Sequence, residues 1–462
     1  MARINRRQFL KSSSAATMFA ATPGLAYSQV VGGGGPFDDY RALVCLFMFG
    51  GNDSFNMLVP RSGAAYNAYL AARSGLPENG GLALPQASLL PISPLLGADE
   101  MDFGLHPDMG ALQSLFETGK ASFVANVGPL VEETTREQFV NGGVALPPQL
   151  FSHNDQQDQW QSLKGNATSR TGWAGRMADL IRTSVADQQM ATNASLFGTN
   201  LFQSADETIA YVMGPNGPVE FFGFSSDPNA GFEYQQRQAF ERILGADYAS
   251  VYERAFAQVQ QRAIDSVDTV LGALRADTTR TFDGVFPSGQ LGAQLRTVAQ
   301  LIAANGDLQM KRQIFFVATG GFDTHDNQVD DQPNLLGNIS SSMAAFQSAL
   351  ESIGMDQQVT TFTQSDFGRT LSSNGDGSDH AWGGHQIVMG GNVNGQRIYG
   401  DYPVPEIGGP LDVGGGRFIP STSADQYAAT LAKWFGIPDA DLDIVAPNLA
   451  NFAERDLGFM IA

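Results

Sequence analysis

Residues 313–326 read QIFFVATGGFDTHD, an apolar run of β-branched and aromatic residues that stops at two glycines before Asp323 and His325. Such a run predicts a buried strand whose carboxyl end opens into a polar loop. Further runs of this kind, each ending in Gly, Asp or Ser, occupy 42–49, 122–127, 359–364 and 386–389. We expect all of them to be strands of one sheet.

Patterns typical of helices separate these strands, at 108–117, 173–183, 290–304, 334–352 and 424–435. This alternation predicts a doubly wound α/β domain, with a mostly parallel sheet and helices on both faces. Ligands of such sheets bind beyond the carboxyl ends of the strands. A long periodic stretch at about 232–275 predicts one or two helices. We place it in a largely helical insertion at about 195–288.

The N-terminus has the features of a twin-arginine signal peptide over residues 1–26. Arg6 and Arg7 are followed by QFLK, a modestly apolar stretch and the small-residue ending GLA. The apolar stretch of about 15 residues is too short for a stable membrane anchor, which needs roughly 20. We therefore expect the twin-arginine translocase to export the chain to the periplasm or the exterior.

The remainder divides into a glycine-containing, flexible lead-in at 27–40 and a folded domain at 41–462. Removing the signal takes away four cations and no acid, so the formal net charge moves from −20 to −24. This acidity argues against nucleic acid or anionic membrane as a partner and favours bound cations. Cys45 is the single cysteine, which rules out an intramolecular disulfide.

Carboxylate and imidazole side chains gather near the ends of the predicted strands. Together they suit Zn²⁺, Mn²⁺ or a related divalent ion. They are Asp53, Asp323, His325, Asp366, Asp379, His380 and His385.

The motifs also carry a family resemblance. FMFGGNDSFN, SHNDQQDQW, GGFDTHDNQ, SDFGRT and DHAWGGHQIVMGGNVNG occur in this order, before PSTSADQYAATLAKWFGI and PNLANF. Together they resemble the bacterial family catalogued as domain of unknown function 1501, over nearly the whole mature chain. That family is similar to the alkaline phosphatase and sulfatase superfamily. The resemblance implies an alkaline-phosphatase-like fold with two metal ions over the sheet.

The resemblance also implies roles for individual residues. Asp53 matches the metal-binding Asp after the first strand, and Ser152 is the candidate nucleophile at a helix N-terminus. Asp323 and His325 match an Asp-His metal-binding group, with tighter spacing than in alkaline phosphatase. Asp366 matches the first member of a later Asp-His pair.

Two further features bear on this match. Phe367 stands where the pair's His is expected, so His380 or His385 would supply the last ligand. With Zn, Mn, Ca or Mg bound, such a site would hydrolyse a small phosphate or sulfate ester, and Arg369 would clamp its oxygens.

Alternatives accompany these interpretations. Asp53 could cap a helix, and Ser152 to Asp155 resemble a capping box, which would also explain His153. Phe367 and the acidic composition favour a second function, that of a non-catalytic exported binding or assembly protein. An exported redox enzyme fits the export route but lacks a cofactor fingerprint.

Overall fold

The computed structural model describes residues 37–96, 101–165, 168–219, 223–276 and 282–461. The predicted signal peptide and residues 27–36 of the predicted lead-in lie outside this part of the chain. Phe37 packs on Arg312, with 3.8 Å from the guanidinium carbon to the ring centroid, and Asp39 pairs with the same guanidinium. The last residues of the predicted lead-in are therefore packed against the domain.

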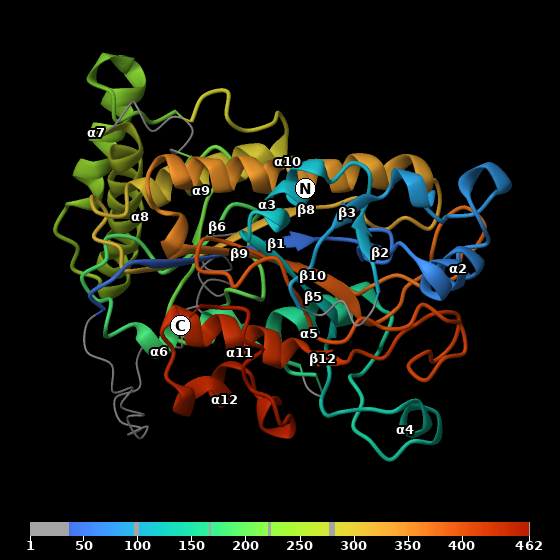
Figure 1. Ribbon diagram of the computed structural model, residues 1–462. Coiled ribbons are helices and arrows are strands. Elements are labelled where there is room, and N and C mark those ends of the chain that lie inside the picture. Colours follow the sequence, from blue (N-terminus) through green and yellow to red (C-terminus); the bar gives the residue numbers. More distant parts are fainter. Residues whose placement is uncertain (1–36, 97–100, 166–167, 220–222, 277–281, 462) are drawn as a thin grey trace, which may run out of the picture. The chain divides into compact units, whose positions relative to one another are not determined.

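A mainly parallel sheet forms the centre of the described chain (Figure 1). Its strand order is β11-β5-β10-β9-β1-β8-β6-β7, and β12 also pairs with β5. β10 is antiparallel to β5 and β9, whereas the other pairs are parallel. The strands are β1 (Arg41–Met48), β5 (Ala121–Gly128), β6 (Asn193–Ser195), β7 (Tyr211–Val212), β8 (Arg312–Thr319), β9 (Val359–Ser365), β10 (Gly384–Met389), β11 (Ile398–Tyr399) and β12 (Thr422–Ser423).

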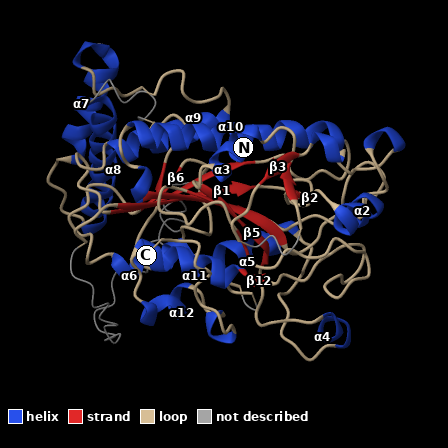
Figure 2. Cartoon of the chain, viewed as in Figure 1, coloured by secondary structure: helices blue, strands red, loops and turns tan. Residues whose placement is uncertain are grey.

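Helices cover both faces of this sheet (Figure 2). Alternate residues of β1 enter two separate cores, which explains its unbroken apolar sequence. The first core includes side chains of α3 (Gly110–Glu117), α9 (Gln290–Ala303) and α10 (Gln328–Ser352). The second includes side chains of α5 (His153–Ser162), α6 (Trp173–Ile181), α11 (Ala424–Phe435) and α12 (Leu442–Val445).

Smaller elements surround this framework. A second, antiparallel sheet has the order β2-β4-β3. The helices α7 and α8 pack on each other around a small core of their own. These elements are β2 (Leu58–Pro60), β3 (Leu90–Ile92), β4 (Phe103–Leu105), α2 (Gly63–Ala72), α4 (Arg136–Asn141), α7 (Phe232–Leu244) and α8 (Val251–Ala276).

The mixed α/β class, the mainly parallel sheet and the strands predicted from apolar runs are confirmed. Two helices lie inside the predicted insertion, together with the short strand β7. α10 begins at Gln328, earlier than the predicted start at 334. Its first turns carry buried glutamines that hydrogen-bond to Asp53, so apolar periodicity did not reveal them. No helix among the described residues is long and apolar enough to cross a membrane.

Candidate functional site

Three polar loops begin side by side at the carboxyl edge of the sheet. They follow β9, β1 and β8, which are neighbours in that order. Met48 at the end of β1 pairs in register with both Thr319 and Ser365, so the three strands end level. Because parallel strands share one carboxyl edge, the loops carrying Asp53, Asp323 and Asp366 start from the same place.

Two glycines after β1 allow these loops to approach closely. Gly50 has φ +115°, and a Cβ there would lie 2.3 Å from the backbone nitrogen of Asp323. Gly51 has φ +84°, and its Cβ would lie 2.3 Å from the ring of Phe367. A larger residue at either position would separate the loops, so the GGND motif has a steric reason at this edge.

The buried side chain of Arg369 contacts all of these loops. Its side chain is completely buried and donates to the carbonyl oxygens of Gly50, Gly51 and Ser378, and to the carboxylate of Asp323. Each guanidinium nitrogen therefore has a partner within the protein. Its predicted role as a clamp for substrate oxygens stays a prediction, and these contacts favour an internal one.

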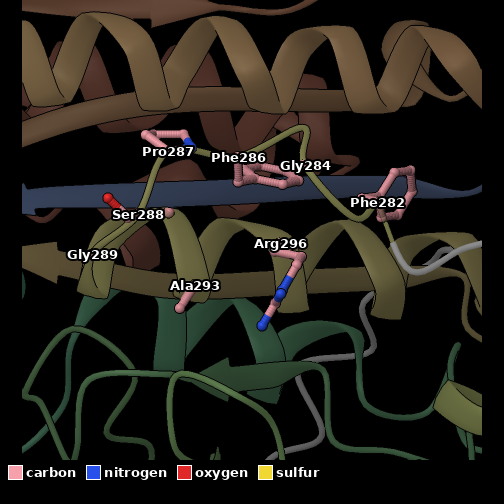
Figure 3. A pocket seen from close by; sticks show the side chains of 9 residues that line it. Phe282, Gly284, Phe286, Pro287, Ser288, Gly289, Ala293 and Arg296 are labelled. Atoms are coloured by element: carbon pink, nitrogen blue, oxygen red, sulfur yellow. The ribbon is translucent and has the colours of Figure 1, made fainter.

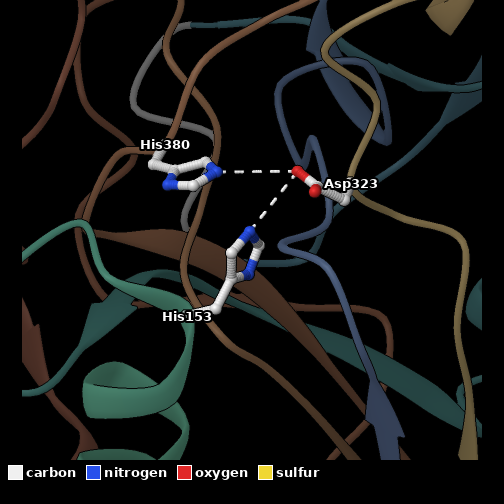
Figure 4. Close-up of side chains that lie close together, drawn as sticks. All are labelled: His153, Asp323 and His380. Atoms are coloured by element: carbon white, nitrogen blue, oxygen red, sulfur yellow. Dashed lines mark ion pairs between the residues drawn. The ribbon is translucent and has the colours of Figure 1, made fainter.

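Imidazoles converge on the exposed carboxylate of Asp323, whose side chain is 50% exposed (Figure 4). The Nε2 atoms of His153 and His380 lie 3.4 and 3.5 Å from its Oδ1. The ligand atoms of these three residues lie within 4.8 Å of one another. The Nε2 of His325 is 3.2 Å from the same Oδ1 and 2.8 Å from the Nε2 of His380. His325 thus adjoins this group, which we call the imidazole cluster: His153, Asp323 and His380, with His325 beside them.

The other ring nitrogen of each histidine is held by a separate partner. The Nδ1 of His153 is 2.6 Å from the Oδ2 of Asp366, which is buried. The Nδ1 of His380 is 2.7 Å from the carbonyl oxygen of Phe151. These acceptors place the proton on Nδ1 and leave the lone pair of Nε2 facing the cluster. The predicted role of Asp366 as a metal ligand stays a prediction, and these contacts favour a role in orienting His153.

The carbonyl oxygen of Phe151, which faces the Nδ1 of His380, belongs to a residue with an unusual backbone conformation. Its φ is +71°, which is strained for a residue with a side chain, and its N–H donates to Gln156. The guanidinium of Arg417 lies 5.4 Å from its ring centroid and donates to the carbonyl oxygen of His380. Strain maintained by several contacts is common where a structure orients a functional group.

Charges within the cluster act on one another. Partial burial raises the pKa of Asp323, but the hydrogen bond and charge of Arg369 lower it more, so the pKa lies below its ordinary value. Burial is also the main cause that lowers the pKa of His380. Asp323 is therefore an anion and His380 a neutral imidazole near neutral pH, the protonation states that a metal ion requires of its ligands.

The donor set fits a divalent cation. The Nε2 of His153 is buried but has no hydrogen-bond partner among the described residues, although it faces a carboxylate and an imidazole. A cation at this point would satisfy that lone pair. Two imidazole nitrogens and one carboxylate oxygen are a common ligand set for zinc and related ions, and leave a coordination position open.

Asp53 and His385 lie outside the imidazole cluster. Asp53 is buried and pairs with Arg73 at 2.5 Å, while its other oxygen accepts from Gln328. His385 is also buried; its Nδ1 accepts from the backbone N–H of Asn126, and burial lowers its pKa to about 3. Their metal-binding roles remain predictions, and the contacts favour structural ones.

Ser152 immediately precedes His153 at the start of α5. Its hydroxyl donates to the Oδ2 of Asp155 at 2.5 Å and accepts no hydrogen bond from a backbone N–H of the helix. The structure therefore corrects the expected capping box. It leaves the hydroxyl next to a carboxylate that could accept its proton, and the nucleophilic role stays a prediction.

His153 was not among the predicted metal ligands, because a helix cap also explained a histidine at this position. Its partner is Asp366, which lies 213 positions further along the chain. Phe367, which stands where a histidine was expected, packs beside this imidazole and that of His380, with centroids 4.8 and 4.6 Å away. The available signal was a histidine at the start of a helix in a chain with five histidines.

A hollow of about 220 Å³ lies elsewhere, at the start of α9 (Figure 3). Phe282, Phe286 and Arg296 are among the residues that line it. It contains none of the cluster residues, and Arg296 donates to Asn216. We therefore regard the carboxyl edge of the sheet as the candidate site.

A family model matches most of the chain. The family model "Protein of unknown function (DUF1501)" matches residues 40–410. No curated protein matches the chain in sequence. Among solved structures, Ps i-CgsB in complex with k-i-k-neocarrahexaose is 8% identical, with a TM-score of 0.31 over 87% of this chain and 74% of that one. A second solved structure, from work on the metabolism of multiple glycosaminoglycans by Bacteroides thetaiotaomicron, is 10% identical. Its TM-score is 0.32, over 87% of this chain and 74% of that one. Likenesses this distant carry no argument about function.

Proposed function

The chain belongs to the DUF1501 family, and we propose that it is an exported, metal-dependent hydrolase of phosphate or sulfate esters with an alkaline-phosphatase-like fold. The observation that carries the proposal is the imidazole cluster. In it, the Nε2 atoms of His153 and His380 face one oxygen of Asp323, while both Nδ1 atoms are held from behind.

His153, Asp323 and His380 would hold the ion. A divalent ion there would polarise an ester oxygen and lower the pKa of an attacking hydroxyl or water. Ser152 is our candidate nucleophile, and the carboxylate of Asp155 would receive its proton. The exposed side of Asp323 leaves room for a small substrate to reach this point.

An anionic ester suits this site because of the charge balance. The chain carries 47 acidic and 27 basic residues. In the cluster, Arg369 is already paired with Asp323. The positive charge that attracts an anion would therefore come from the ion, as it does in metal-dependent ester hydrolysis.

The test combines metal content with activity. Chain purified without chelator should carry a divalent ion and hydrolyse at least one member of a panel of aryl phosphates, phosphodiesters and aryl sulfates. Asp323→Ala and His380→Ala should lose both properties. Asp443→Ala is the matched control, since Asp443 is equally exposed and also pairs with one arginine. A metal-free chain that hydrolyses no ester refutes the proposal.

The second candidate is a non-catalytic exported binding or assembly protein. It is favoured by the ion pairs of Asp53 and Arg369 within the protein, since both residues were predicted to act on the metal or the substrate. Under this function, Asp323→Ala would leave the cellular phenotype of the gene unchanged. Under the first function, the phenotype would be lost with the activity.

Export is proposed from the sequence and is tested separately. Arg6→Lys together with Arg7→Lys should keep the chain in the cytoplasm, as cell fractionation would show. The twin-arginine translocase is the proposed partner in that step. A chain exported equally well without the arginine pair would contradict this route.

A further inference from the structure

Asp366 faces the imidazole cluster but acts within the protein. It is fully buried, and its Oδ2 accepts from three donors: the Nδ1 of His153, the side-chain amide of Gln157 and the backbone N–H of Gly50. An oxygen with three donors at 2.6 to 3.2 Å has its lone pairs directed at those donors. This oxygen therefore holds the Nδ1 of His153, while the Nε2 of the same ring faces the imidazole cluster.

Asp53, which the family resemblance assigns to metal binding, already has a cation beside it. The guanidinium of Arg73, itself completely buried, pairs with its Oδ1 at 2.5 Å. The same oxygen accepts from the backbone N–H of Phe55, and the other accepts from Gln328. A second ion here would have to displace a buried arginine and leave its charge unpaired, which is strongly unfavourable.

Phe367 occupies the position at which a further metal ligand is expected. Its ring is buried between Gly51 on one side and the imidazoles of His153 and His380 on the other. An aromatic ring offers no donor to a metal ion, and it restricts the tilt of both imidazoles. A second site would therefore lack two ligands. Asp53 is paired with Arg73, and Phe367 stands where the resemblance predicts a histidine.

We infer that the site takes one divalent ion rather than two, and that Asp366 acts on this ion through His153 as a positioning residue. The inference rests on the proposed function and adds the stoichiometry and the role of Asp366. The Oδ1 of Asp366 is buried and has no hydrogen-bond partner among the described residues. A second ion would use this atom, so the number of bound ions tests the inference.

The first measurement is stoichiometry on the full chain. Metal is removed by chelation, and Zn²⁺ or Co²⁺ is returned under equilibrium dialysis. We expect one ion per chain, together with a Co²⁺ visible spectrum that His380→Ala abolishes. Binding of two ions, or of none, overturns the inference.

The second measurement separates a positioning residue from a ligand. Asp366→Leu removes the acceptor for His153 and should weaken Zn²⁺ binding about 10–100-fold without changing the stoichiometry. Asp366→Asn keeps an oxygen that can accept from Nδ1, so the loss should be smaller. Asp376→Asn is the charge control, since Asp376 is an exposed acid on the loop that leads to His380. The Zn²⁺ affinity of this variant should match that of the wild type.

Folding is monitored by circular dichroism. If Asp366→Leu does not fold, Asp366→Ala, which also removes the acceptor, takes its place, because a displaced His153 must alter the Co²⁺ spectrum or the affinity. A variant identical to the wild type in both overturns the positioning role.

The outcomes also separate this inference from the proposed function. Two ions with hydrolysis intact refute the inference alone. One ion without hydrolysis of any ester refutes the function alone.

Discussion

Lowering the pH should destabilise this protein through His385, a histidine buried in the core. Its ring lies 4.6 Å from that of Tyr402 and 5.1 Å from that of Phe55, and its Nδ1 accepts from the N–H of Asn126. Burial lowers its pKa to about 3, from an ordinary value of about 6.5. Between these values the unfolded chain binds one more proton than the folded chain, so stability falls as pH falls.

The magnitude follows from the two pKa values. Between about pH 7 and about pH 5, proton binding to the unfolded state should reduce the free energy of unfolding by about 2 kcal/mol. His385→Asn removes this titration and keeps an oxygen that can accept from Asn126. Asp425, whose pKa burial raises to about 7, contributes with the opposite sign, but it is present in both proteins and cancels.

The assay is urea unfolding of wild type and His385→Asn at several pH values. Near pH 7 the variant should be less stable, because it loses ring contacts with Tyr402 and Phe55. The gap should close by about 2 kcal/mol at about pH 5. Parallel pH profiles for the two proteins would refute the reasoning.

Three further results are expected. Arg73→Met should lower the free energy of unfolding by about 3–5 kcal/mol, because it leaves Asp53 buried without its partner; urea unfolding should show partial recovery when Asp53→Asn is added, and no recovery would contradict a pair. Gly51→Ala should cost about 1–3 kcal/mol from its φ of +84° alone. It should also weaken Zn²⁺ binding by pushing Phe367 toward the imidazoles, whereas unchanged affinity would show that the ring has room to move. Ser152→Ala should reduce ester hydrolysis about 100-fold or more with Zn²⁺ affinity unchanged, and full activity would exclude this hydroxyl as the nucleophile.

Local sequence was sufficient for the framework. An apolar run such as that of β1 reads as a strand buried on both faces, because each residue enters one of two cores. The carboxyl ends of such strands carry the polar loops, so Asp323, His325 and His380 were site candidates from their position after predicted strands. The motif order was likewise sufficient for the family.

Tertiary structure decided which polar residues meet. Asp53 and Asp366 follow strands in the same way in the sequence, yet one pairs with Arg73 and the other with His153. The early part of α10 was hidden for the same reason, since its glutamines are buried by hydrogen bonds to Asp53.

The physical reason is the range over which each preference acts. Strand and helix formation depends on neighbouring side chains, which a sequence displays directly. The role of a carboxylate depends on the partner that reaches it, and those partners come from elements far apart in the chain. His153 becomes a candidate ligand because a strand end 213 residues away places a carboxylate behind its ring.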